Sequence, residues 1–318
     1  MTPLPPELKL TNLDEPLFED AQATKRDLVE YLDAVSEQLI GELRDRPLSV
    51  MRALRGQKPF MQKNVPKYAP PWVQTVTIWA ETSKRDVAYA LCNDRPTLLW
   101  FANQRAVEYH PTLLRAEPPD FPQTYLVLDL DPPAGAAFDV VVRTAGLVRQ
   151  ALADAGLAGA VKTSGAKGAH VFVPLAHPVS AEAIAAATRA LAARAEAIDP
   201  ELATTTYVVA DRGGKVFIDG TRAGGATVVA AYSPRIRPGT PVSFPVAWDE
   251  LDRVVPSDFT IQTVPALMGD GNPWADELPE PQRLPDALIE EGRAIPVARV
   301  AAMHEGKRRR ARERRQQS

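Results

Sequence analysis

The first clear pattern along the chain is helical. Between residues 25 and 43, apolar side chains recur every three or four positions, which predicts an amphipathic helix with Thr24 as its N-cap. Residues 75–92 contain two runs rich in β-branched and aromatic residues around a charged turn, which predicts a β-hairpin. We therefore expect helix and sheet to combine early in the chain.

A proline-rich stretch at 111–122 interrupts this pattern and predicts a connection between two lobes. Beyond it, apolar runs alternate with helical periodicity. We expect strands at 124–131, 159–163, 169–175, 215–219 and 226–232, and helices at 138–155 and, capped by Ser180, at 180–198. Prolines recur from Pro234 to about Pro285 and predict mostly loop around a short helix at 248–251.

Composition narrows the class of protein. The 318 residues suffice for one large or two small domains, and ordinary hydrophobic and charged fractions exclude a coiled coil or wholesale disorder. A single cysteine, Cys92, excludes an internal disulfide and CxxC metal motifs. No uncharged apolar run approaches the roughly 18 residues of a membrane span, and the N-terminus lacks a signal-peptide pattern. We expect a cytoplasmic protein without a membrane partner.

The charge is unevenly distributed. Residues 307–315 hold seven of the 37 basic groups and one of the 40 acidic groups, so the remainder carries 30 − 39 = −9. Contacts with a polyanion must therefore come from this tail or from local patches. One such patch is the acid-free stretch 51–80, where Arg52 and Lys63 stand among aromatics such as Phe60, a composition suited to DNA. The aromatic residues could equally belong to the core.

Two aspartates, Asp129 and Asp131, end an apolar strand, and Asp219 ends another in the same way. Residues i and i+2 of a strand share a face, so the carboxylates would converge and repel each other unless a cation neutralises them. Oxygen ligands suit Mg²⁺ or Mn²⁺. The alternative is a pair of solvated aspartates at a strand end.

A glycine-rich turn lies between the strands expected at 159–163 and 169–175. Glycines allow backbone N–H groups to approach an anion, and the turn also offers polar side chains: its members are Ser164, Gly165, Lys167, Gly168 and His170. Downstream, Arg235 and Arg237 could face one phosphate chain together. Taken singly, the turn could be a plain hairpin, the arginines surface residues, and His110 a structural histidine.

In order along the chain, several segments together resemble the polymerase domain of bacterial non-homologous end-joining ligase D, a branch of the archaeo-eukaryotic primase superfamily. The segments are LTNLDEPLF (10–18), PFMQKN (59–64), VEYHP (107–111), LVLDLDPP (126–133), KTSGAKGAHVFVPL (162–175), GKVFIDG (214–220) and VAAYSPRIRPGTPVSFPVAWDEL (229–251). The ordered set is far more specific than any single motif.

This resemblance implies roles for individual residues. Asp129, Asp131 and Asp219 would bind two Mn²⁺ or Mg²⁺ ions. The incoming nucleotide would contact Ser164, Gly165, Lys167, Gly168, His170, His110, Arg235 and Arg237. DNA would contact Lys25, Arg52, Phe60 and Lys63.

The chain also departs from the family pattern. Glu15 stands where the family usually has a lysine that, with the lysine matched by Lys25, resembles a grip for a 5′-phosphate. Met61 replaces the second of two paired phenylalanines. After Asp219, a polar, lysine-bearing stretch is replaced by GTRAGGATVVAA, in which Arg222 could compensate.

The resemblance implies an α+β fold with a primase-like catalytic core of mixed and antiparallel sheets flanked by helices, preceded by an α/β lobe. We expect an N-terminal arm (1–24), a DNA-facing lobe (25–115), the catalytic core (116–260), a loop-rich extension (261–305) and a basic tail (306–318). The chain looks like the stand-alone form of this domain.

The implied activity is metal-dependent nucleotidyl transfer to primer-template or gapped DNA, with primase activity and a preference for ribonucleotides as further expectations. The implied partners are nucleoside triphosphates, Ku and a separate DNA ligase, near the nucleoid. Two alternatives are a catalytically weak module that bridges DNA ends and a two-metal phosphodiester hydrolase.

Overall fold

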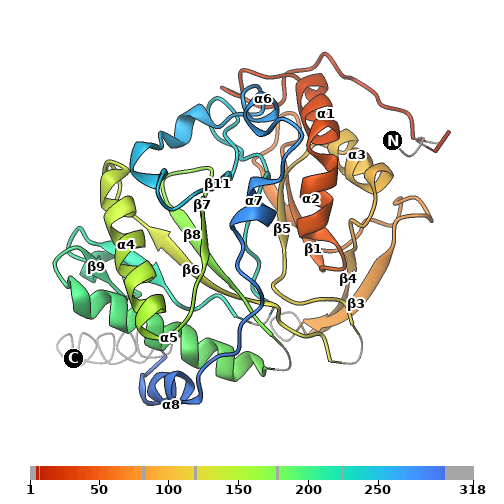
Figure 1. Cartoon of the computed structure of the whole chain (residues 1–318). Coiled ribbons are helices and arrows are strands. Elements are labelled where there is room, and N and C mark those ends of the chain that lie inside the picture. The colour runs from red at the N-terminus through yellow and green to blue at the C-terminus, as the bar shows by residue number, and fades with distance from the viewer. Residues whose placement is uncertain are drawn as a thin grey trace, which may run out of the picture.

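In the computed structural model, the chain folds into two lobes that pack against each other (Figure 1). The structure describes residues 5–6, 8–80, 84–117, 120–176, 179–223 and 225–297. The basic tail expected at 306–318 and the end of the expected extension, 298–305, lie outside the described residues.

The first lobe is a mixed layer of sheet and helices. Strand β1 is central and pairs with β2, β4 and β5, while β3 pairs with β4, all antiparallel. Helices α1, α2 and α3 pack against this sheet (Figure 1). The elements are α1 (Lys25–Ala34), α2 (Ser36–Leu43), β1 (Leu48–Arg52), β2 (Phe60–Gln62), β3 (Thr75–Ala80), β4 (Arg85–Ala90), α3 (Arg95–Asn103) and β5 (Ala106–Pro111).

The helix expected over 25–43 forms, but as two helices with a break at Val35. Its start is as predicted: the Thr24 side chain accepts the Asp27 N–H, and the Asp27 carboxylate accepts the Thr24 N–H, which makes a capping box. The hairpin expected at 75–92 is confirmed by the pairing of β3 with β4.

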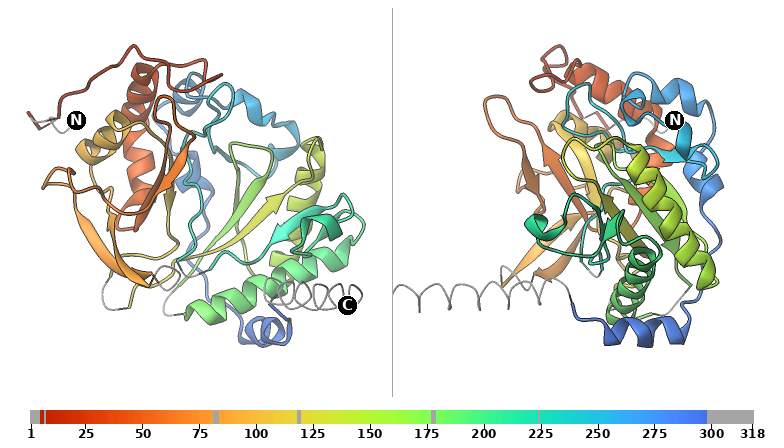
Figure 2. Two further views of the ribbon diagram at one scale, coloured as in Figure 1. Left: turned by 180° about the vertical axis from the view of Figure 1, so that it is seen from behind. Right: turned by 90° about the vertical axis from the view of Figure 1, so that its left-hand side faces the viewer.

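The second lobe contains a six-stranded sheet in the order β11-β7-β8-β6-β10-β9, antiparallel except for the β10–β9 pair. Helices α4 and α5 cover one face, and α8 packs on the outside of α5 (Figure 2). The elements are β6 (Tyr125–Asp131), α4 (Asp139–Asp154), β7 (Ala160–Thr163), β8 (Ala169–Pro174), α5 (Ala181–Ile198), β9 (Ala203–Thr204), β10 (Val216–Asp219), β11 (Pro245–Val246) and α8 (Asp286–Ala294). Two short helices, α6 (Val264–Met268) and α7 (Pro273–Glu277), instead bury their apolar side chains in the core of the first lobe.

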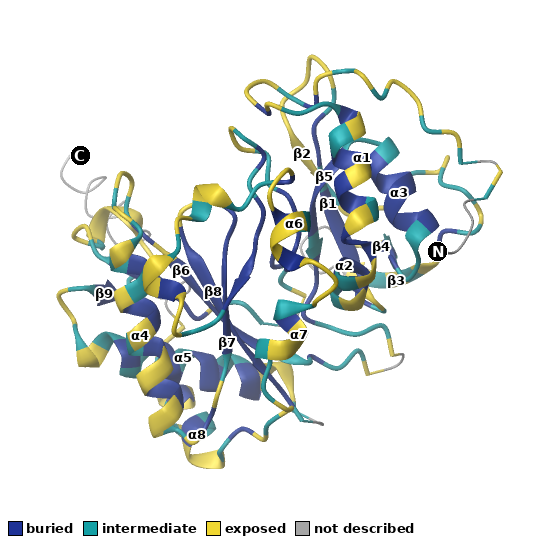
Figure 3. Ribbon diagram, turned by 45° about the horizontal axis from the view of Figure 1, so that its top comes forward, coloured by how far each residue is buried: buried dark blue, intermediate teal, exposed yellow. Residues whose placement is uncertain are grey.

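The two faces of this sheet belong to two different cores. Leu126, Leu128 and Leu130 of β6 pack with α4 and α5, whereas Val127 and Phe172 pack into the core of the first lobe. The strands are therefore buried on both sides (Figure 3). Because side chains alternate along a strand, every second residue of β6 points toward the first lobe.

One predicted strand is wrong. Residues 226–232, of which 228–232 are buried, form no strand: Val228 and Ala230 donate single hydrogen bonds to the carbonyls of Pro111 and Tyr109, at the end of β5. Neither bond is returned, because Pro111 has no N–H and the Tyr109 N–H donates to Ser233 Oγ, so no ladder forms. The α+β class is confirmed, and no helix among the described residues is long and apolar enough to cross a membrane.

Candidate active site

Four polar side chains form a row across the sheet of the second lobe. In the strand register, Asp219 is opposite Asp129, Asp129 is opposite His170, and His170 is opposite Lys162. The neighbours of these residues along the strands pack mainly into the α4–α5 core. The four side chains therefore point to the other face, toward the first lobe, and all four residues are buried.

An arginine lies between the two buried carboxylates. Arg222 Nη2 is 2.9 Å from Asp129 Oδ2, and Arg222 Nε is 3.2 Å from Asp219 Oδ2. Among the described residues, no group of three or more Asp, Glu, His or Cys side chains is arranged as a metal site. The cluster instead neutralises part of its charge with a guanidinium from its own chain.

The pKa values of the acids reflect this arrangement. Burial alone would raise the pKa of Asp129, but His170 and Arg222 outweigh it and hold that pKa below its ordinary value. Asp131 ends β6 at the more exposed side. Desolvation of its carboxyl group, and then the negative charge of Asp129, raise the pKa of Asp131 to about 6. The structure thus gives Asp129 and Asp131 of β6 unequal proton affinities and places Asp219 beside them on the neighbouring strand β10.

A buried chain of hydrogen bonds continues from Asp129 along the row. His170 Nε2 is 3.3 Å from Asp129 Oδ1, and His170 Nδ1 is 2.9 Å from Lys162 Nζ. Lys162 Nζ also donates to Ser243 Oγ at 2.6 Å. Burial, and next the charge of Lys162, lower the pKa of His170 to about 4, so the imidazole is neutral at neutral pH.

The glycine turn between β7 and β8 is compact. Ser164 Oγ accepts the N–H groups of Ala166 and Gly168 at 3.2 and 3.1 Å. Gly165 has a φ of 66°, and a Cβ on Gly168 would lie 2.1 Å from the carbonyl oxygen of Leu130, so neither position tolerates a larger residue. The side chain of Lys167 is exposed beside this turn.

Glu108 brings the predicted His110 and Arg235 together. Its Oε2 lies 2.8 Å from His110 Nε2 and 3.2 Å from Arg235 Nε, and its Oε1 accepts the Ile236 N–H at 2.8 Å. Burial would raise the pKa of Glu108, but the two basic partners lower it to about 2. Arg235 also donates to the carbonyl of Ser164, so this group adjoins the glycine turn. Arg237 is exposed.

Two of the four residues expected to contact DNA are instead engaged inside the protein. Lys25 Nζ donates to the Thr11 carbonyl at 2.6 Å and to Asn103 Oδ1 at 2.8 Å, and burial lowers its pKa. Arg52 donates to the Gln104 carbonyl, Gln62 and Tyr68. Phe60 and Lys63 are exposed at β2 and directly after it.

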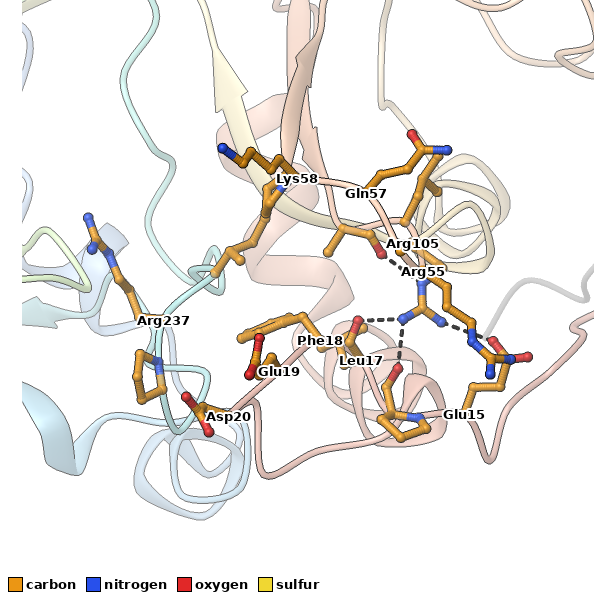
Figure 4. A pocket seen from close by; sticks show the side chains of 17 residues that line it. Glu15, Leu17, Phe18, Glu19, Asp20, Arg55, Gln57, Lys58, Arg105 and Arg237 are labelled. Carbon is orange, nitrogen blue, oxygen red and sulfur yellow. Dashed lines mark hydrogen bonds and ion pairs between the residues drawn. The ribbon is translucent and has the colours of Figure 1, made fainter.

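A pocket of about 830 Å³ lies between the N-terminal arm, the 53–59 loop and residues 236–238 (Figure 4). Arg105 ties the arm to the loop: it donates to the carbonyls of Ala53 and Pro16 at 2.7 Å each and pairs with Glu15 at 3.4 Å. Arg237 lies across the pocket from Glu15 (Figure 4). The ionisable residues that line it are Glu15, Glu19, Asp20, Arg55, Lys58, Arg105 and Arg237.

Sequence reasoning missed three residues of this site. Glu108 lies two positions before His110. Residues i and i+2 of a strand share a face, so this spacing could have indicated that Glu108 lies beside His110. Lys162 was a lone lysine in an apolar strand, which is also a usable signal. Ser243 carried no signal, because its place beside Lys162 depends on the fold.

The chain is similar to known proteins along most of its length. The family model described as LigD, primase-polymerase domain, matches residues 24–274. The multifunctional non-homologous end joining protein LigD of Mycobacterium bovis is 36% identical over 253 residues, 76% of this chain and 33% of that protein. The bifunctional non-homologous end joining protein LigD of Bacillus subtilis is 32% identical over 296 residues, 90% of this chain and 47% of that protein.

Among solved structures, the polymerase domain from Mycobacterium tuberculosis ligase D in complex with DNA matches with a TM-score of 0.79 and 32% identity. The match covers 86% of this chain and 98% of that one. The chain spans less than half the length of the two curated relatives described above. The fold expected from the ordered motifs is confirmed by the structural match.

Proposed function

The chain belongs to the LigD primase-polymerase domain family, and we propose that it transfers nucleotides from nucleoside triphosphates to primer-template or gapped DNA. The observation that carries this proposal is the placement of the acidic cluster beside the glycine turn. Asp129 is opposite His170 in the β6–β8 register, and the turn that holds Ser164 and Lys167 leads directly into β8.

The residues present fit a divalent metal. The strand register brings carboxylate oxygens together, and the ion pairs of Arg222 with Asp129 and Asp219 support a cation-binding role for this cluster. We assign Asp129, Asp131 and Asp219 as the residues that would hold Mg²⁺ or Mn²⁺. When bound, such ions would polarise the reacting phosphoryl group and support the attacking and leaving oxygens.

The nucleotide would lie along the glycine turn. The exposed ammonium of Lys167 and the guanidinium of Arg237 are free to meet phosphate oxygens, since no described partner engages either of them. Arg235 and His110 are oriented by Glu108. Ser164, Gly165 and Gly168 shape the turn, so their contribution is the close approach of backbone to ligand.

DNA would contact the first lobe through exposed groups. Phe60 offers a ring for base stacking and Lys63 a charge for the backbone. Lys25 and Arg52 would stabilise this surface and not bind DNA directly, because their N–H groups donate to acceptors within the protein. Ku and a separate ligase are proposed partners in end joining, in the bacterial cytoplasm near the nucleoid.

Primer extension tests the proposed function. Wild-type protein should extend a labelled primer on gapped DNA with Mn²⁺ or Mg²⁺, and runs with ribo- and deoxynucleotides measure sugar preference. The double change Asp129→Ala and Asp131→Ala should reduce extension at least about a hundredfold, because several kcal/mol of charge stabilisation are lost. Circular dichroism should show an intact fold.

Asp154→Ala is the matched control for this experiment. Asp154 ends α4 on the exposed outer side, where it accepts from Gln150, so its removal should leave extension unchanged. Near wild-type extension by the double variant would contradict the assignment of the acidic cluster.

A further inference from the structure

Lys162 is a fully buried lysine with no role in the mechanism described so far. Its exposed fraction is 0%, and its Nζ lies 5.5 Å from the centre of the Phe172 ring. Burying a charge is costly, and a well-packed apolar side chain of similar volume is often neutral or stabilising at such a place. Stability alone therefore does not account for a lysine at this position.

The hydrogen bonds around Lys162 have a definite direction. Ser243 Oγ donates its hydrogen to the Thr163 carbonyl at 2.7 Å, so it accepts from Lys162 Nζ at 2.6 Å. Lys162 is thus a donor to Ser243, and its Nζ also lies 2.9 Å from His170 Nδ1. Burial lowers the pKa of Lys162, but even a neutral amine has a second N–H that Nδ1 can accept.

The contact on the opposite side of the imidazole places the ring proton on Nε2. His170 Nε2 lies 3.3 Å from Asp129 Oδ1, and an ionised carboxylate can only accept. The ring proton therefore belongs on Nε2. Lysine on one side and carboxylate on the other both select the Nε2–H tautomer of His170.

We propose that Lys162 is a positioning residue: it holds His170 in the Nε2–H tautomer, and through that bond it fixes the Oδ1 side of Asp129. The other oxygen, Oδ2, then faces Arg222. Ser243 keeps the ammonium of Lys162 in place. The functional part of this proposal rests on the proposed role of Asp129, whereas the tautomer itself does not.

Two substitutions separate the hydrogen bond from the packing. Lys162→Met removes the donor and keeps a long side chain, and Lys162→Gln keeps an N–H donor without the charge. Lys215→Met is the matched control: Lys215 donates to the Pro200 carbonyl at the surface, away from the polar row.

The first measurement is the tautomer of His170, by ¹⁵N-histidine NMR. The chain has only four histidines, and His170→Asn assigns the signal. We expect the Nε2–H form in all three proteins, because Asp129 also selects it. The Nδ1 chemical shift should be that of a hydrogen-bonded acceptor in the wild type and in Lys162→Gln, and that of a free imine nitrogen in Lys162→Met. A hydrogen-bonded Nδ1 signal in Lys162→Met, or equal Nδ1 shifts in the two variants, would overturn the proposal.

The second measurement is single-nucleotide addition. In Lys162→Met, kcat should fall about tenfold or more while nucleotide KM changes little, because a misplaced catalytic group affects the chemical step. Lys162→Gln should recover to within about threefold of the wild type. Urea unfolding should show Lys162→Met to be as stable as the wild type or more so.

The two readouts separate the possible failures. If the wild type adds no nucleotide, the proposed function fails, and the Nδ1 signal still decides whether Lys162 holds His170. Wild-type kcat in a Lys162→Met protein that has lost the hydrogen bond to Nδ1 would overturn the link from Lys162 to Asp129. Loss of activity with an unchanged Nδ1 signal would overturn the positioning role as well.

Discussion

At the scale of single residues, Glu108 shows how a buried acid can organise two basic groups. Its side chain is 8% exposed and meets His110, Arg235 and the Ile236 N–H. Because its pKa is lowered to about 2 in the folded state, the unfolded chain binds a proton more readily. Glu108 therefore stabilises the fold above about pH 4.5, and this contribution is lost as pH falls toward about 2.

We predict that Glu108→Gln lowers the free energy of unfolding by about 3 kcal/mol near pH 7, since it leaves Arg235 without its buried carboxylate. The variant should also lose less stability than the wild type between about pH 5 and pH 3. Burial also lowers the pKa of His110, so this group too makes the fold less stable as pH falls, at a higher pH than Glu108 does. Urea titrations at several pH values measure both effects; parallel pH curves for the two proteins would contradict the assignment.

At the scale of elements, the packing of α8 on α5 depends on a glycine. A Cβ at Gly292 would lie 1.8 Å from the Ala186 carbonyl oxygen, so the two helices touch backbone to backbone there. Arg189 donates to the Gly292 carbonyl at 3.1 Å, and Arg194 pairs with Glu291 at 2.5 Å beside the contact. The backbone contact and the two arginine interactions therefore fix the position of α8 on α5.

We predict that Gly292→Ala destabilises the protein by about 1–3 kcal/mol in urea unfolding, because overpacking outweighs the helix preference of about 1 kcal/mol for alanine. Gly146→Ala is the control. Gly146 lies in the exposed face of α4 with open space around its Cβ position, so alanine there should stabilise by up to about 1 kcal/mol. The same sign for both variants would contradict the packing argument.

At the scale of the whole molecule, a pocket lies between the N-terminal arm and residues 236–238 (Figure 4), and we propose that a DNA end would meet this part of the surface. Glu15 pairs with Arg105, and Lys25 is buried against Thr11 and Asn103. The pocket therefore offers a 5′-phosphate less positive charge than two exposed lysines would.

We predict that a 5′-phosphate beside a gap improves binding of the wild type by less than about threefold. Glu15→Lys should enlarge this benefit to about fivefold or more and steepen the salt dependence by about one phosphate contact. Fluorescence anisotropy with gapped DNA, with and without the phosphate at two salt concentrations, measures both quantities.

Glu201→Lys controls for the change in net charge, because Glu201 is 91% exposed on the other lobe. An equal gain from this control would show that net charge alone is responsible. A strong phosphate preference in the wild type would show that Glu15 matters less than we infer.

The sequence by itself determined the elements whose signals are local. The Thr24 and Ser180 caps, the hairpin at 75–92 and the strand that ends in Asp129 and Asp131 are all where periodicity and capping rules expect them. The ordered motifs were sufficient for the family, because each one carries chemistry within a few adjacent residues.

Only the tertiary structure decided the contacts between distant segments. Nothing local predicts that residues 226–232 stay outside the sheet, since that depends on whether a neighbouring strand accepts them. The row Asp219, Asp129, His170 and Lys162 exists because three strand registers align, and a shift by one residue would turn each side chain to the other face. The partners of Lys162 and Arg222 follow from that register, because hydrogen bonds between buried groups form only where the fold brings donors to acceptors.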